Sequence, residues 1–161
     1  MARTPTPALK DWFDKARFQN VAGHLAEIHQ GFDRKKFLTL ALSGLDELSL
    51  LQRMRRMTVC THEALPTDYP ETLKVLYQLA PRIDHSFVTL FMPDYVGLYG
   101  QDHFDQSMEA LKFFTSFGSS EFAIREFLKR DLKRTLKVMS RWSSDENDHV
   151  RRLASEGCRP R

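Results

Sequence analysis

Cysteine is scarce in this sequence of 161 residues, and long apolar runs are missing from it. The two cysteines, Cys60 and Cys158, lie far apart, which excludes both a disulfide framework and a set of cysteine zinc ligands. Without a run of membrane length, and with no apolar signal-peptide core in MARTPTPALKDW, the sequence predicts a cytoplasmic protein that has no membrane partner. Both thiols are expected to stay reduced and to be buried structural groups.

Glycine and proline are also few, with seven of each, and they fall between segments whose apolar residues recur at helical intervals. Residues 82–100 are rich in aromatics and could form a strand. We favour short helices there, broken before Pro93, because the neighbouring segments are helical. Helical segments are predicted over 9–30, over 33–66 with a division at Ser43-Gly44, over 68–81 with Pro70 in its first turn, over 105–118 and over 119–157.

The closing part of the chain carries clear helix-end signals. Gly118 stands where a helix C-terminus is expected. Ser119 or Ser120 can cap the next helix, whose first turn contains Glu121. The other predicted boundaries are Asp131 as an N-cap, Ser143 with Glu146 as a capping box, and Gly157 as a helix end.

Short helices in series predict an all-α fold of HEAT-like antiparallel helix pairs that form an α-solenoid, in one domain over residues 1–161. An echo supports this prediction. Ile124-Arg125 and Val150-Arg151 repeat an aliphatic-Arg step 26 residues apart, and this step is a familiar feature of the second helix of a HEAT repeat. A compact helical bundle is the alternative.

Positive charge is concentrated at the C-terminal end. The chain has a net charge of +3, but residues 119–161 contain 11 Lys and Arg against 7 Asp and Glu, whereas the preceding residues contain 13 against 14. Such a patch suggests phosphate or another polyanion as partner, with a solvated face as the competing interpretation. Charge alone does not decide between the two.

Two motifs in this region, SSEFAIREFL over 119–128 and DHVRRLASEGCRPR over 148–161, resemble the DNA alkylation repair glycosylases of the AlkC type, relatives of AlkD. The resemblance is fainter over LKDWFD, LDELSLLQRM and LPTDYPETLKVL. It implies a base excision repair enzyme that hydrolyses the N-glycosidic bond of cationic N3-alkylated bases in double-stranded DNA, as a monomer, without a cofactor and without a base-flipping pocket. Members of this family continue beyond the match to Arg161. The chain is therefore expected to be an N-terminal part of a longer enzyme and inactive alone.

The resemblance also implies roles for individual residues. Glu121 is the predicted catalytic carboxylate, because a negative charge beside the deoxyribose stabilises the cation that forms as the glycosidic bond breaks. The competing interpretation of Glu121 is an acid that merely favours a helix N-terminus. The residues predicted to contact DNA are Ser119, Ser120, Arg125, His149, Arg151, Arg152, Arg159 and Arg161.

Several alternatives stay open at this point. Arg125 is equally compatible with a salt bridge between repeats. Lys129, Lys133, Lys137 and Arg141 recur every four residues and could face either DNA or solvent. No metal site is predicted, because the spacing of His24, Glu27 and His29 does not match a zinc-binding HExxH motif. A non-catalytic HEAT-repeat scaffold that binds nucleic acid or protein is the alternative function.

Overall fold

The computed structural model describes residues 8–159, which form nine α-helices and four short 3-10 helices and contain no β-strand. The all-α prediction is confirmed for these residues, and the strand alternative for residues 82–100 is wrong. The chain divides into two compact units, Met1–Pro66 and Thr67–Arg161. Within the described part of the chain, no helix is long and apolar enough to cross a bilayer.

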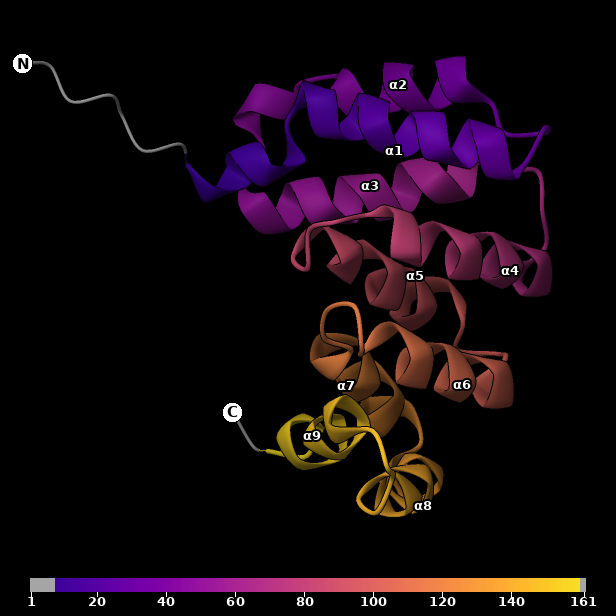
Figure 1. Ribbon diagram of the computed structural model, residues 1–161, viewed down its shortest axis with the longest axis vertical. Helices are drawn as coiled ribbons and strands as arrows, with labels where there is room; N and C mark the ends of the chain where they lie inside the picture. Colours follow the sequence, from indigo (N-terminus) through magenta and orange to yellow (C-terminus); the bar gives the residue numbers. More distant parts are fainter. Residues whose placement is uncertain (1–7, 160–161) are drawn as a thin grey trace, which may run out of the picture. The chain divides into compact units, whose positions relative to one another are not determined.

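In the first unit, α2 packs against both α1 and α3, and Figure 1 shows these helices running side by side. The predicted division at Ser43-Gly44 is confirmed. Gly44 has a φ of +63°, a left-handed conformation that favours glycine. It lies two residues after the end of α2, immediately before the next short helix. The elements of this unit are η1 (Leu9–Phe13), α1 (Lys15–Ile28), α2 (Arg34–Leu42), η2 (Leu45–Glu47) and α3 (Leu50–Ala64).

Aromatic rings and one buried arginine hold the first unit together. The ring of Phe18 lies between those of Phe13 and Phe37, with centroid distances of 6.5 and 6.3 Å. Arg53 of α3 is buried, and its Nη1 donates to the carbonyls of Lys10 and Phe13 at 3.1 and 3.2 Å. Because main-chain carbonyls satisfy this guanidinium, its burial fastens η1 onto α3.

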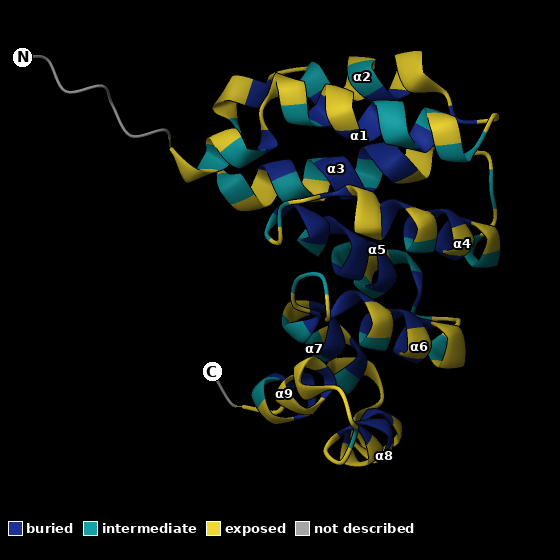
Figure 2. Ribbon diagram, viewed as in Figure 1, coloured by how far each residue is buried: buried dark blue, intermediate teal, exposed yellow. Residues whose placement is uncertain are grey.

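The second unit is centred on α5, which packs against α6 and α7 and is buried over most of its first half (Figure 2). The chain then continues through α7, which contacts both α8 and α9, and these last two helices pack on each other. Their outer sides are exposed. The elements are α4 (Tyr69–Leu79), η3 (Ala80–Arg82), η4 (Val88–Leu90), α5 (Phe91–Tyr99), α6 (Phe104–Phe114), α7 (Glu121–Arg130), α8 (Leu132–Trp142) and α9 (Asp148–Gly157).

The predicted boundaries of α5 and α6 are wrong. The helix α5 continues through Pro93, which lies in its first turn, where a missing N–H breaks no intrahelical bond. The helix α6 ends at Phe114, before Gly118, and Gly118 does not have a positive φ. Close packing explains this glycine, because a Cβ atom there would lie 2.6 Å from Thr89 Oγ1 and 2.7 Å from the Ser86 carbonyl oxygen.

The two thiols are expected to react very differently. Cys60 is 1% exposed, and burial raises the pKa of its thiol to about 11, whereas Cys158 is exposed, so its predicted burial is wrong. A disulfide reagent at pH 8 should therefore modify Cys158 at once and Cys60 only after unfolding, because the thiolate is the reactive form. Absorbance of the released thiol measures this. The Cys158→Ser variant should lose the fast phase, and fast release of two thiols per chain would contradict the prediction.

Candidate functional site

A small pocket in the second unit brings together residues from the α6–α7 connection, the start of α7 and one side of α9. Its volume is about 160 Å³. Four of the predicted site residues line it together, although 30 positions separate Ser119 from His149. The lining residues are Thr115, Gly118, Ser119, Glu121, His149, Arg152, Leu153 and Glu156.

The two serines before α7 have different roles. Ser119 is exposed, and its Oγ accepts the Glu121 N–H at 3.2 Å, so it supports the start of the helix. Ser120 is fully buried, and its Oγ donates to the Leu111 carbonyl at 2.7 Å. The geometry therefore leaves Ser119 available at the pocket and gives Ser120 the structural role of anchoring the connection to α6.

Glu121, the first residue of α7, directs its carboxylate to a cation one turn along the helix. Arg125 Nη2 donates to Glu121 Oε1 at 2.5 Å. The side chain of Arg125 is 18% exposed and that of Glu121 is 20% exposed. The pair is therefore partly buried at the edge of the pocket. Arg125 thus contacts the candidate acid directly.

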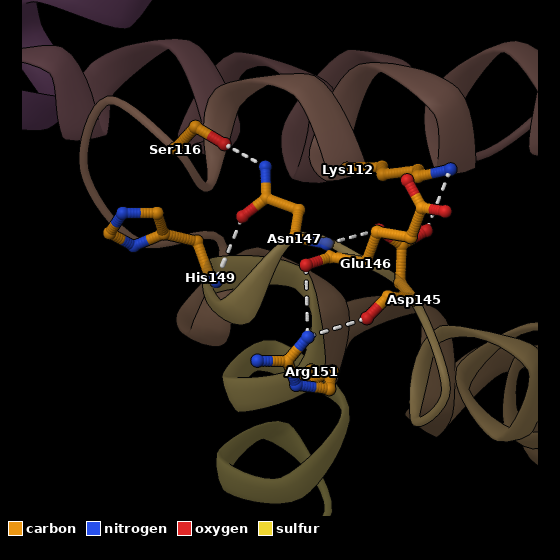
Figure 3. Close-up of polar contacts among 7 residues, drawn as sticks. All are labelled: Lys112, Ser116, Asp145, Glu146, Asn147, His149 and Arg151. Atoms are coloured by element: carbon orange, nitrogen blue, oxygen red, sulfur yellow. Dashed lines mark hydrogen bonds and ion pairs between the residues drawn. The ribbon is translucent and has the colours of Figure 1, made fainter.

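A set of polar contacts between α6 and the connection before α9 places the other wall of the pocket (Figure 3). Lys112 Nζ lies 3.1 Å from Asp145 Oδ2, and Asn147 Nδ2 donates to Ser116 Oγ at 2.9 Å. Asn147 is also the N-cap of α9, because its Oδ1 accepts the His149 N–H at 2.9 Å. These contacts fix where α9 begins, and with it the positions of His149 and Arg152.

The predicted capping box of Ser143 and Glu146 is therefore wrong, since Asn147 caps the helix. Ser143 Oγ instead donates to the Ser140 carbonyl at 2.6 Å. Arg151, near the start of α9, also bonds to this connection: its Nη1 donates to the carbonyls of Asp145 and Glu146 at 2.7 and 3.0 Å (Figure 3). This arrangement does not favour the predicted DNA contact of Arg151, because the guanidinium is engaged by the main chain.

Asp145 is expected to make the connection before α9 sensitive to acid. Its pKa is lowered, chiefly by the hydrogen bond from the Asn147 N–H and then by the hydrogen bond from Lys112. A folded-state pKa below the unfolded one means that the stabilisation is complete above the ordinary aspartate pKa and is lost as pH falls through the lower, folded value. We expect the connection to loosen only below about pH 4. NMR titration of the Asp145 carboxyl measures the midpoint, which Lys112→Met should raise. A midpoint at the ordinary aspartate value would contradict the prediction.

The remaining predicted residues are placed as follows. Arg152 is exposed in the pocket, and its guanidinium has no ion-pair partner among residues 8–159. Arg159 lies 3.5 Å from Glu156 across one turn and is 67% exposed. Arg161 lies outside the described residues. The geometry therefore keeps Ser119, Glu121, His149 and Arg152 together as a candidate site.

Glu156 is not among the residues predicted from the sequence, yet it lines the same pocket as Glu121. The spacing of Glu156 along the sequence could have identified it as a site residue. His149, Arg152 and Glu156 follow one another at intervals of three and four residues, which places them on one face of a helix. Because Arg152 was predicted to contact DNA, the same helical face predicts Glu156 beside it.

A larger pocket, of about 690 Å³, lies at the opposite end of α7. Two of its three acids are already paired with arginines: Arg130 donates to Asp102 at 2.6 Å and Arg134 to Asp105 at 3.4 Å. The third, Asp131, caps α8 by accepting the Arg134 N–H at 3.2 Å. None of the predicted site residues lines it. We place the candidate site at the smaller pocket, because that pocket combines acids with an exposed cation that is not already paired.

Comparisons with known proteins bear on both the fold and the family of this chain. No family model matches the sequence. It is 42% identical over 154 residues to the uncharacterised protein YhaZ of Bacillus subtilis (strain 168), covering 95% of this chain and 43% of that protein. It is 55% identical to the Pseudomonas fluorescens alkylpurine DNA glycosylase AlkC bound to DNA containing an abasic site analog, with a TM-score of 0.95 over 98% of this chain and 44% of that one. The resemblance to AlkC-type enzymes and the HEAT-like fold class are confirmed, and the chain spans less than half the length of either relative.

Proposed function

We propose that this chain, which is homologous to an AlkC-type DNA glycosylase, forms part of an enzyme that removes cationic N3-alkylated bases from double-stranded DNA. The observation that carries the proposal is the pocket at the start of α7. It combines a half-buried carboxylate with exposed polar and cationic groups in a chain that is 55% identical to a glycosylase solved on DNA. No separate observation favours a non-catalytic scaffold.

The chemistry needs few groups. Alkylation at N3 makes the base cationic and hence a good leaving group, so little help from a general acid is required. The main barrier is the positive charge that develops on the deoxyribose as the glycosidic bond breaks. A fixed carboxylate beside that sugar lowers the barrier, because its charge is already oriented when the cation forms.

The pocket residues divide between this chemistry and DNA binding. Glu121 faces the sugar cation, and Glu156 places a second carboxylate in the same pocket, where it can orient an attacking water. Arg152 and His149 contact phosphates beside the lesion, with Ser119 as a further hydrogen-bonding group. The volume of about 160 Å³ is below the roughly 300–1,000 Å³ of pockets that enclose small molecules, which suits an enzyme that leaves the base in its duplex.

Base release from methylated duplex DNA tests the proposal. The full-length protein should release 3-methyladenine or 3-methylcytosine, identified by mass spectrometry, and should leave an abasic site. The 161-residue chain alone should bind DNA but release little base, because it spans under half the length of its relatives. An unmethylated duplex is the control. Absence of any released base from the full-length protein would refute the proposal.

A further inference from the structure

We infer that Arg125 is a positioning residue that holds the Glu121 carboxylate in place, and that it is not a DNA-phosphate ligand. This inference rests on the proposed function and names a further residue for the same reaction. It starts from two facts: both residues belong to α7, one turn apart, and their side chains meet at 2.5 Å. Pairs at this spacing are direct neighbours on a helix surface.

Burial favours a positioning role over phosphate binding. The Arg125 side chain is only 18% exposed, whereas that of Arg159 is 67% exposed. A phosphate would have to compete with Glu121 for a guanidinium that is already half-buried. The ion pair is therefore better suited to fixing a neighbouring carboxylate than to capturing a strand of DNA.

The hydrogen bonds of Arg125 differ from those of the arginines that stabilise main chain in this protein. Arg53 and Arg151 both donate to backbone carbonyls. Arg125 donates to the side chain of Glu121, and its Nε is buried without a hydrogen-bond partner in the part of the chain that the structure describes. The Phe122 ring lies 5.7 Å from the guanidinium carbon and helps to hold it. The hydrogen bond of Arg125 therefore orients an acid at the pocket, whereas those of Arg53 and Arg151 hold main-chain segments in place.

Orientation matters because the carboxylate acts on a charge that exists only during the reaction. A displacement of about 1 Å can cost as much as about 10² in rate. Without Arg125, the Glu121 side chain gains other rotamers, and only a fraction of molecules retain the productive one. We expect Arg125→Met to lower the single-turnover rate of base release by about tenfold and to leave the affinity for DNA within about twofold.

Three single variants and one double variant of the full-length protein, compared with the Glu121→Gln parent of the double variant, test this inference. Arg125→Met keeps the apolar stem, and Arg125→Lys keeps a cation that can pair with Glu121 and should restore most of the rate. Arg130→Met is the matched control: it removes the same charge from the same helix, but its partner is Asp102. In a Glu121→Gln background, Arg125→Met should cause no further loss, because the group that it positions is gone.

The outcomes separate the possible roles. Weaker DNA binding with a smaller salt dependence, at an unchanged rate, would make Arg125 a phosphate ligand and overturn the inference. An equal loss in both backgrounds would also overturn it, because that pattern indicates a purely structural residue. If the parent protein releases no base, the proposed function fails. Crystal structures of the parent and of Arg125→Lys and Arg125→Met then decide the inference: a Glu121 carboxylate that moves only without the cation supports it, and one that stays in place refutes it.

Discussion

Glu121→Gln is expected to lower the rate of base release from methylated duplex DNA by about 10²–10³ in the full-length protein. Glutamine preserves the shape of the side chain and retains an oxygen that can accept the hydrogen bond from Arg125. It removes the negative charge that the developing sugar cation requires. A fall of this size corresponds to about 2.7–4 kcal/mol of lost transition-state stabilisation.

The structure also defines what Glu121→Gln should leave unchanged. The fold should persist, since the acid lies at the edge of a pocket and outside the apolar core. Affinity for intact DNA should not fall, because a carboxylate repels phosphate. Rate measured at saturating protein therefore isolates the chemical step, and circular dichroism checks the fold.

Glu126→Gln is the matched control for this variant. Glu126 lies on the same helix and pairs with Lys129 at 3.1 Å, but it is exposed and does not line the pocket. It should release base at the parent rate. If Glu121→Gln does the same while melting slightly lower, the acid only stabilises the helix and its ion pair, and the catalytic assignment is wrong.

Arg152→Ala is expected to weaken duplex binding by about 10- to 100-fold, the effect of losing a hydrogen bond to a charged group worth about 1.5–3 kcal/mol. Arg152 is exposed in the pocket and is not engaged by an acid of the described chain, so its charge is available to a phosphate. Each phosphate contact releases a counterion on binding. The slope of log affinity against log salt should therefore fall by about 1. Fluorescence anisotropy over a range of salt concentrations measures both changes.

Lys137→Ala tests whether DNA binds at the pocket or at another surface of the protein. Lys137 is exposed on α8 and does not line the pocket. It should change neither affinity nor slope appreciably. Arg151→Ala should act differently again, lowering the melting temperature by freeing the carbonyls of Asp145 and Glu146. Equal losses of affinity from Arg152→Ala and Lys137→Ala would show that the pocket is not the DNA-binding face.

Local signals in the sequence predicted most helices correctly because they act over a few residues. Asp131 caps α8 by accepting the Arg134 N–H, and Pro70 lies in the first turn of α4, both as expected. Each of these features depends on hydrogen bonds or apolar contacts within a turn or two of the same helix, and the neighbouring residues alone specify them.

Errors occurred where two candidates competed locally and a distant contact decided between them. Ser143 with Glu146 and Asn147 are both plausible caps, but Asn147 also bonds to Ser116, and this contact with the α6–α7 connection selects it. Gly118 has the position of a helix terminator in the sequence, yet its small size is required by Thr89 and Ser86, which lie 29 and 32 residues earlier in the chain. No short window of sequence contains these partners.

The paired steps Ile124-Arg125 and Val150-Arg151 show where local information ends. Their aliphatic residues are both buried, as the helical period alone requires. Their arginines diverge: Arg125 meets a carboxylate of its own helix, whereas Arg151 bonds to the carbonyls of the connection that precedes it. Sequence periodicity and the closing motifs were sufficient for most of the helices and for the resemblance to the family. The pocket required tertiary structure, because Glu121 and Glu156 share it only once α7 and α9 pack together, and that packing depends on the shapes of side chains far apart in the chain.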